Sequence, residues 1–343
     1  MKYHTIVFMM LECVAAGRLL GVSARIVPLE LGLAEAAAII RSGGLVAFPT
    51  ETVYGLGANA LDRAAVIQIF VAKGRPSSNP VIVHVSSFEE ARCLSSDWTQ
   101  LAERLASRFW PGPLTIVVRA GAAVPGVVTA GGTTVGIRMP SHEGALALLR
   151  LAGVPIAAPS ANRSECISPT TAGHVQRGFA RASNDLLILD GGPCTVGIES
   201  TVVDATGDNP IILRLGEISH AEIGSIDSLG MQPLGVRSEP ARSPGQSKRH
   251  YAPNCPVRCC DVLGLPDTVL PSMWILSIGE TDIHHVNHIR VGTTVREVCT
   301  RLYAAFHTAN DAGASEVIIV GLPSESMWDA VRDRINRACA SVE

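Results

Sequence analysis

Short apolar runs alternate with helical patterns along the chain from Leu33 onward. Apolar positions spaced three and four residues apart predict helices with one buried face, and short continuous apolar runs predict buried strands. The pattern predicts helices over 33–41, 63–72 and 98–109, a short helix capped by Ser87 and a further helix opening near Thr170. Strands are expected over 45–48, 81–85, 114–119, 135–138, 155–158, 186–189, 201–204 and 211–215. This alternation indicates an α/β domain with a large mixed sheet.

The pattern stops near residue 225 and resumes after Pro256. Residues 225–250 are rich in Ser, Pro, Gly and Arg and have little periodicity, which is the composition of a linker. Beyond them we expect strands over 257–260, 274–278 and 317–320, and helices over 294–312 and 327–340. These elements predict a second, small α/β domain.

The first 24 residues precede the pattern. Their apolar stretch is interrupted by Glu12 and Arg18 and has no small-residue cleavage site, so we interpret it as an extension of the domain and not as a signal peptide. No apolar run reaches about 18 residues, the length that a membrane-spanning helix requires, so none is predicted.

Composition narrows the class of protein. The 343 residues are 47% hydrophobic and 17% charged, which is typical of a globular chain of two domains. A formal net charge of -3 gives no general electrostatic reason for binding a nucleic-acid backbone. The nine cysteines contain no C-x-x-C pair, which favours a reducing, cytoplasmic setting over a zinc site or a disulfide framework. Only three lysines occur, at positions 2, 73 and 248.

Two polar segments follow predicted elements in the first half of the chain. The first, PTETVYGLGANA (49–60), is a polar loop that could hold a small zwitterion or form an ordinary turn. The second, KGRPSSNP (73–80), carries Lys73, Arg75 and Asn79 behind a helix C-terminus. Its two cations could stabilise the helix dipole, or could bind phosphate oxygens as a point charge and a planar fork.

Two more polar segments follow in the second half. APSANRSECISPT (158–170) presents hydroxyls before a predicted helix, as an anion site or as a serine-rich surface loop. GIESTVVD (197–204) has Ser200 at a strand start, and Arg214 lies on the next predicted strand. Arg138, in GIRMP, ends another strand, where a buried arginine usually pairs with an anion.

These segments, in this order and together with KRHYAP (248–253), resemble the long, two-domain form of the YrdC family, the L-threonylcarbamoyladenylate synthases. The resemblance implies an open, twisted mixed α/β sheet with a concave, positively charged cavity, followed by a Rossmann-like α/β domain. It covers about residues 25–340, and the extension (1–24) departs from it. We expect a YrdC-like catalytic domain (25–224), a linker that acts as a lid (225–253) and a C-terminal domain (254–343).

The resemblance also implies an activity. Members of the family condense L-threonine, bicarbonate or CO2, and ATP into threonylcarbamoyl-AMP and pyrophosphate, with Mg2+ accompanying the ATP. Other proteins transfer the threonylcarbamoyl group to adenosine 37 of tRNAs that read ANN codons. We therefore expect a cytoplasmic nucleotidyltransferase that has these downstream partners, binds no nucleic acid stably, touches no membrane and has no metal site of its own.

The family's site residues map onto positions in this chain. Lys73 and Arg75 are the expected catalytic cations. The implied threonine pocket consists of Thr52, His84, Arg138, the backbone of Ala158, and Ser200. The implied ATP contacts are Arg75, Asn79, Thr134, Ser160, Asn162, Ser168, Arg214 and Tyr251.

Some residues permit another interpretation. His84 lies inside an apolar strand and could be a core histidine with structural partners only. The cluster of His284, His285 and His288 has no recognised metal-binding spacing and is expected in a loop. Two other functions also remain possible: an RNA-binding module, and a carbamoyl-adenylate-forming enzyme of another pathway, which would be expected to carry acylphosphatase-like and zinc-finger segments.

Overall fold

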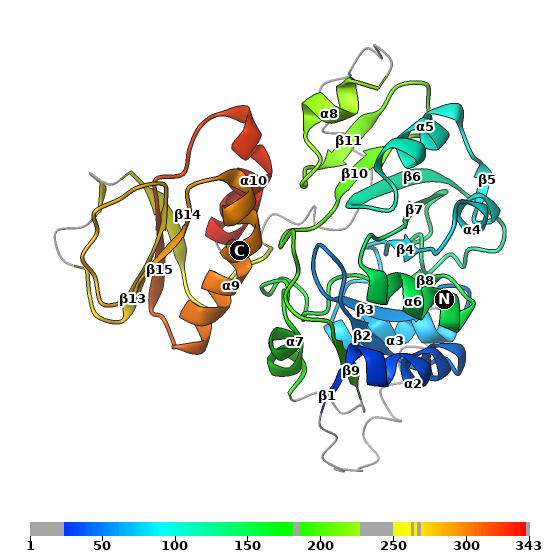
Figure 1. Ribbon diagram of the computed structural model, residues 1–343, viewed down its shortest axis with the longest axis horizontal. Coiled ribbons are helices and arrows are strands. Elements are labelled where there is room, and N and C mark those ends of the chain that lie inside the picture. The colour runs from blue at the N-terminus through cyan, green and yellow to red at the C-terminus, as the bar shows by residue number, and fades with distance from the viewer. Residues whose placement is uncertain (1–23, 181–185, 227–249, 262–263, 266–268, 341–343) are drawn as a thin grey trace, which may run out of the picture.

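The computed structural model describes residues 24–180, 186–226, 250–261, 264–265 and 269–340. They form a larger N-terminal and a smaller C-terminal α/β domain (Figure 1). Nearly all of the expected N-terminal extension, and residues 227–249 of the expected linker, lie outside the described residues.

The larger domain is built on one mixed sheet. Its strands are β1 (Arg25–Pro28), β2 (Val46–Phe48), β3 (Gly55–Asn59), β4 (Val83–His84), β5 (Ser95–Asp97), β6 (Leu114–Ala120), β7 (Thr134–Arg138), β8 (Ile156–Ala157), β9 (Leu187–Asp190), β10 (Thr201–Asp204) and β11 (Ile211–Arg214). They lie in the order β1-β9-β2-β3-β8-β4-β7-β6-β10-β11, with β5 paired to β6. Four neighbouring pairs are parallel (β1 with β9, β2 with β9, β4 with β7, β6 with β10) and the others are antiparallel. The predicted open, mixed sheet is confirmed.

Helices cover this sheet. They are α2 (Leu29–Arg41), α3 (Arg63–Lys73), α4 (Phe88–Cys93), α5 (Gln100–Phe109), α6 (Glu143–Ala152), α7 (Ala172–Phe179) and α8 (His220–Gly224). Asp62 caps α3, and Ser87 caps α4 as expected, by accepting hydrogen bonds from backbone N–H groups of the first turn. The pattern missed α6, whose N-terminus is capped by a less usual residue, His142.

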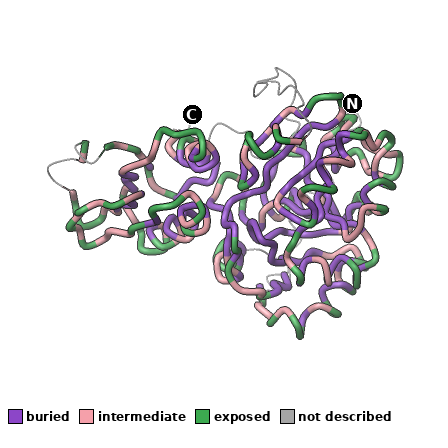
Figure 2. The backbone as a smooth tube through the Cα atoms, turned by 45° about the horizontal axis from the view of Figure 1, so that its top comes forward, coloured by how far each residue is buried: buried purple, intermediate pink, exposed green. Residues whose placement is uncertain are grey.

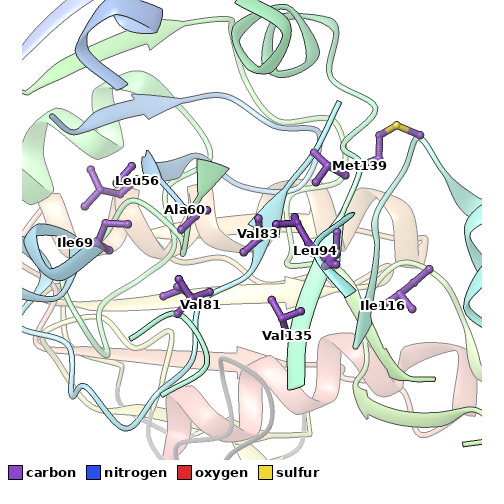
Figure 3. Close-up of a cluster of buried hydrophobic side chains, with 14 of the residues drawn as sticks. Leu56, Ala60, Ile69, Val81, Val83, Leu94, Ile116, Val135 and Met139 are labelled. Atoms are coloured by element: carbon purple, nitrogen blue, oxygen red, sulfur yellow. The ribbon is translucent and has the colours of Figure 1, made fainter. Parts of the chain in front are cut away.

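Each face of the sheet packs against its own helices. On β2, Val46 and Phe48 pack with the apolar faces of α2 and α6, whereas Ala47 between them packs on the other side with α3, α5 and α7. This alternation follows from the two-residue period of a strand. Figure 3 shows part of the second cluster, where Val83, Ile116 and Val135 come from three different strands. Apolar side chains therefore cover both faces of the sheet at β2.

The smaller domain has a parallel sheet in the order β12-β15-β13-β14. Its elements are β12 (Val257–Cys260), β13 (Met273–Ile278), β14 (His288–Gly292), α9 (Val295–Asp311), β15 (Glu316–Val320), a 3-10 turn η2 (Ser326–Trp328) and α10 (Asp329–Cys339). The prediction of a loop at His288 is wrong, because this residue begins β14 and its ring nitrogen bonds Ser277 Oγ at 2.8 Å. The described residues contain no group of three or more His, Cys, Asp or Glu side chains placed to hold a metal ion.

Helices α9 and α10 face the larger domain (Figure 1). One hydrophobic cluster joins Val53, Ile167 and Ile198 of the larger domain to Leu302 and Phe306 of α9. Figure 2 shows buried chain running through the larger domain and into the helices that face it. The smaller domain therefore packs directly on the polar segments around residues 52, 167 and 198.

Candidate active site

A cavity with about 540 Å3 of empty space, open solvent at its mouth included, collects residues from most of the polar segments. It is lined by Thr50, Thr52, Val53, Gly55, Arg75, Ile82, His84, Arg138, Ala158, Pro159, Ser160, Glu199, Ser200, Arg214, His250 and Tyr251. All five residues of the implied threonine pocket are in this set. Of the implied ATP contacts, Arg75, Ser160, Arg214 and Tyr251 are in it.

Strand register brings together residues of the implied threonine pocket that are far apart in sequence. His84 and Arg138 are direct partners on the parallel strands β4 and β7, so their side chains leave the same face of the sheet. Ala158 donates its N–H to Ile82 O, and Ser160 forms a bridge with Gly55. Residues that are far apart in sequence therefore meet because neighbouring strands carry them.

Arg138 is a buried cation with several partners. Its Nη2 lies 2.6 Å from Glu51 Oε1, Nη1 donates to Thr52 Oγ1 at 2.9 Å, and Nε donates to Gly112 O at 3.2 Å. Burial alone would raise the pKa of Glu51, but the charge and hydrogen bond of Arg138 hold it below its ordinary value. A guanidinium has five N–H donors, so this geometry leaves donors for a ligand carboxylate in the cavity.

His84 is neutral at physiological pH. Burial, followed by the charge of Arg138, lowers its pKa to about 3. Its Nδ1 is buried and has no hydrogen-bond partner among the described residues, which is unusual for a core histidine. The imidazole thus offers a polar atom to whatever fills the cavity.

Arg75 and Arg214 form a second positive region. Arg75 donates to Asn79 O and Pro80 O at 3.2 and 2.9 Å, and Arg214 donates to Ser200 O and Ser200 Oγ, both at 3.0 Å. Both side chains are nearly inaccessible to solvent. Burial lowers the pKa of Arg75 to about 10, so it remains charged at pH 7. Asn79 acts here through its carbonyl, which fixes Arg75.

Lys73 lies behind the cavity wall. Its Nζ donates to Ser160 O at 2.5 Å, to Asn162 O, and to Asn162 Oδ1 at 3.3 Å. Burial, then the charge of Arg75, lowers its pKa well below the ordinary value. An ammonium has three N–H donors, so these contacts occupy all of them and hold the 160–162 turn in place.

Asn162 and Ser168 also support residues that line the cavity. Ser160 Oγ donates to Asn162 Oδ1 at 2.6 Å, and Ser168 Oγ donates to Glu199 Oε1 at 2.6 Å. Thr134, the remaining implied ATP contact, instead lines a separate, smaller cavity beside Thr115 and Val202, at the opposite end of β7 from Arg138.

Two residues at the end of the expected linker line part of the cavity. His250 and Tyr251 are buried, and the Tyr251 ring stacks on Tyr303 of α9 with the ring centroids 5.6 Å apart. Burial lowers the pKa of His250 to about 3 and raises that of Tyr251 to about 12. His250 Nδ1 and Tyr251 Oη have no hydrogen-bond partner among the described residues, so both polar atoms are available to a ligand.

The sequence did not reveal that two glutamates of the polar segments form buried ion pairs with arginines. Glu51 pairs with Arg138, and Glu199 pairs with Arg334 of α10, with Nε 3.0 Å from Glu199 Oε2. Both glutamates stand inside the quoted polar segments, next to residues that were singled out. A buried arginine usually has a carboxylate partner, and this rule was the available signal.

Comparisons with known proteins agree with this arrangement. A family model covering Sua5, YciO and YrdC proteins, described as "Telomere recombination", matches residues 38–216. A second model, described as "Threonylcarbamoyl-AMP synthase, C-terminal domain", matches residues 217–340. The chain belongs to the long, two-domain YrdC family.

Relatives within this family resemble the chain over most of its length. The threonylcarbamoyl-AMP synthase of Pyrococcus abyssi is 41% identical over 320 residues, which cover 88% of this chain and 92% of that protein. The threonylcarbamoyl-AMP synthase of Schizosaccharomyces pombe is 35% identical, covering 90% and 88%. The crystal structure of P. abyssi Sua5 complexed with L-threonine superposes with a TM-score of 0.81 at 40% identity and covers 93% and 96%.

No helix in the described part of this YrdC-family chain combines the length and the apolar character that crossing a bilayer requires.

Proposed function

We propose that this protein is a threonylcarbamoyl-AMP synthase, a nucleotidyltransferase that forms threonylcarbamoyl-AMP and pyrophosphate from L-threonine, bicarbonate or CO2, and ATP. Two-domain relatives that bear this name support the proposal, as does the structure of one such protein with L-threonine. The observation that carries it is a single cavity in which three buried arginines, Arg75, Arg138 and Arg214, are arranged around neutral hydroxyl and imidazole groups.

Arg138 and its neighbours suit the amino acid. The Arg138 donors that remain beside Glu51 and Thr52 would pair with the threonine carboxylate. The neutral His84 and the hydroxyls of Thr52 and Ser200 would bind its polar groups without adding charge. Ala158 also lines this cavity, and its small side chain leaves room for the substrate.

Arg75 and Arg214 suit the triphosphate. Planar guanidinium groups bind phosphate oxygens well, and their burial strengthens the attraction by excluding water. Tyr251 would add a hydroxyl donor, while Lys73 and Asn162 keep the turn that bears Ser160 in position. Mg2+ would be bound together with the ATP and would offset part of the charge of its phosphates.

The reaction needs positioning more than proton transfer. The threonine amine adds to CO2 and loses a proton, which gives a carbamate. A carbamate oxygen then forms a bond to the α-phosphorus while the bond from that phosphorus to the β-phosphate oxygen breaks, and pyrophosphate leaves. Negative charge moves across the phosphoryl oxygens, where Arg75 and Arg214 would stabilise it.

The product is a mixed anhydride that water would destroy. Tyr251 and His250 cover the cavity from the linker side, which would limit access of water during the reaction. Other cytoplasmic proteins would then transfer the threonylcarbamoyl group to adenosine 37 of tRNAs that read ANN codons. This synthase need not bind tRNA, in keeping with its net charge of -3.

The direct test is to incubate the full-length protein with L-threonine, bicarbonate and Mg-ATP. We expect pyrophosphate and threonylcarbamoyl-AMP in equal amounts, and no pyrophosphate when L-threonine is left out. A well-folded preparation that releases no pyrophosphate in response to threonine would rule the proposal out. A tRNA-binding isotherm measured at several salt concentrations tests the alternative of an RNA-binding module.

A further inference from the structure

Among the described residues that line the cavity, Glu199 is the one acidic residue. It stands beside Ser200, whose backbone and hydroxyl receive hydrogen bonds from Arg214. Under the function proposed above, this cavity has to accept a triphosphate and an amino-acid carboxylate. An uncompensated carboxylate in the wall would repel mainly the triphosphate, because threonine is a zwitterion without net charge.

The smaller domain provides the compensation. Arg334 Nε of α10 donates to Glu199 Oε2 at 3.0 Å, and Tyr303 Oη of α9 donates to the same oxygen at 3.0 Å. The other oxygen, Oε1, accepts from Ser168 Oγ at 2.6 Å. The side chains of Arg334 and Tyr303 are completely buried, so these contacts are shielded from water.

Arg334 also contacts Tyr251, one of the residues that line the cavity. Its Cζ lies 5.4 Å from the centroid of the Tyr251 ring, within the range of a cation–π interaction. Tyr251 in turn stacks on Tyr303. One side chain of the smaller domain thus touches both the acidic group of the cavity wall and the ring that covers the cavity.

The charges of this cluster are mutually stabilising. Burial alone would raise the pKa of Glu199, but Arg334, Arg214 and the Ser168 hydroxyl hold it below its ordinary value. Burial alone would lower the pKa of Arg334, but the neighbouring Tyr251 and Glu199 hold it well above its ordinary value. Glu199 and Arg334 are therefore both ionised at neutral pH, and their charges cancel.

We propose that Arg334 is a positioning residue through which the smaller domain makes the cavity competent for ATP. Arg334 cancels the charge of Glu199 and fixes its carboxylate toward α9 and α10, so that Glu199 does not offset the attraction of Arg75 and Arg214 for the triphosphate. It acts through Glu199 and Tyr251 and does not itself contact the substrate. The proposal rests on the proposed function and gives the smaller domain a defined part in it.

The ordinary alternative is that the Glu199–Arg334 pair only holds the two domains together. The two roles differ in which quantity changes when Arg334 is replaced. If the pair only holds the two domains together, the melting temperature falls and the KM for ATP of the folded protein stays at the wild-type value. If the role is electrostatic, Glu199→Gln removes the repulsive charge, and ATP binding returns.

The experiment compares Arg334→Met, the double variant Arg334→Met/Glu199→Gln, and a control, Arg332→Met. Arg332 lies on the same helix and pairs with Asp329 at 2.5 Å, away from the cavity. We expect Arg334→Met to raise the KM for ATP at least tenfold at pH 8, with the KM for threonine within about twofold of the wild-type value. The double variant should recover most of the affinity for ATP, and Arg332→Met should behave as the wild type.

A pH profile gives a second readout. Without Arg334, the largest of the effects that lower the pKa of Glu199 is lost and its pKa should rise, so Arg334→Met should regain affinity for ATP as the pH is lowered from 8 to 6. The cavity histidines do not titrate in this range, because burial lowers the pKa of both His84 and His250 to about 3. The wild type should show no such gain.

Two results overturn the proposal, provided that both variants melt at the wild-type temperature. One is a KM for ATP that is unchanged in Arg334→Met, and the other is a raised KM that the double variant does not repair. If the variants melt early, calorimetric binding of a non-hydrolysable ATP analogue below the melting temperature decides by the same comparison. Failure of the proposed function is visible separately, as a wild-type protein that binds the analogue but releases no pyrophosphate with threonine.

Discussion

Replacing Arg138 by methionine should separate the structural from the ligand-binding role of this residue. Methionine keeps an unbranched, apolar side chain but removes the charge that lies 2.6 Å from Glu51. Glu51 is only 5% exposed, so its carboxylate would stay buried without its cation. Removing one partner of a buried ion pair costs about 3–5 kcal/mol of stability.

The loss should depend on pH in a defined direction. In the wild type Arg138 holds the pKa of Glu51 below its ordinary value of 4.5, so the pair stabilises the fold above that pH and loses its effect as the pH falls through the lowered pKa. In the variant, only backbone hydrogen bonds still oppose burial, so the pKa of Glu51 should rise, and the penalty grows as the pH rises from the ordinary value toward the raised one. The difference in stability should therefore be larger at pH 8 than at pH 5.

Threonine binding should weaken for a different reason. Each charge-assisted hydrogen bond to the ligand carboxylate contributes about 1.5–3 kcal/mol, which corresponds to about a 10- to 150-fold rise in the KM for threonine. Adding Glu51→Gln removes the buried charge, so the double variant should regain much of the stability but none of the affinity for threonine.

Urea unfolding at pH 5 and pH 8 measures the stability, and threonine-dependent pyrophosphate release measures the KM. Arg119→Met is a suitable control, since Arg119 is more than half exposed and lies 3.9 Å from Asp97, an arrangement that contributes at most about 1 kcal/mol. Equal destabilisation at both pH values would refute the ion-pair reasoning. A wild-type KM for threonine in the double variant would refute the assignment of Arg138 to the carboxylate.

Three further predictions concern the ATP side of the site. Lys73→Arg should lower both the melting temperature and kcat, because the larger guanidinium has to enter a space where the compact ammonium already meets three acceptors. Full activity in this variant would show that the geometry at Lys73 is not needed. Tyr251→Phe should leave the melting temperature unchanged, since the buried hydroxyl has no partner among the described residues, while the KM for ATP rises about two- to tenfold. A melting temperature lowered by several degrees would contradict this. Chelation of Mg2+ should stop pyrophosphate release without changing the melting temperature of the ATP-free protein, and release that persists in excess chelator would exclude the metal.

Most of the fold could be predicted because its signals are local. Capped helices such as α3 and apolar strands such as β6 carry their pattern within a few residues. The prediction was wrong where the local signal pointed elsewhere. Strand β3 (Gly55–Asn59) has two glycines and an asparagine and was interpreted as a loop, but its pairing with β2 and β8 makes it a central strand.

The candidate site was predictable in its residue types and less so in its geometry. The residues implied for the threonine pocket line one cavity, as the resemblance led us to expect, although their roles stay predictions. Thr134 lines a different cavity, because a five-residue strand separates it from Arg138 at the other end of β7. Lys73 points into the 160–162 turn and does not line the cavity.

The sequence by itself determined the order of the elements, the two domains that they build and the polar segments that interrupt them, because hydrophobic period and turn chemistry act over short distances. Only the tertiary structure decided which charges meet. Glu199 and Arg334 are 135 residues apart, and nothing in the local pattern of either one indicates the other. Burial removes water from both, so each requires an opposite charge nearby, and the packing of α10 against the larger domain supplies it.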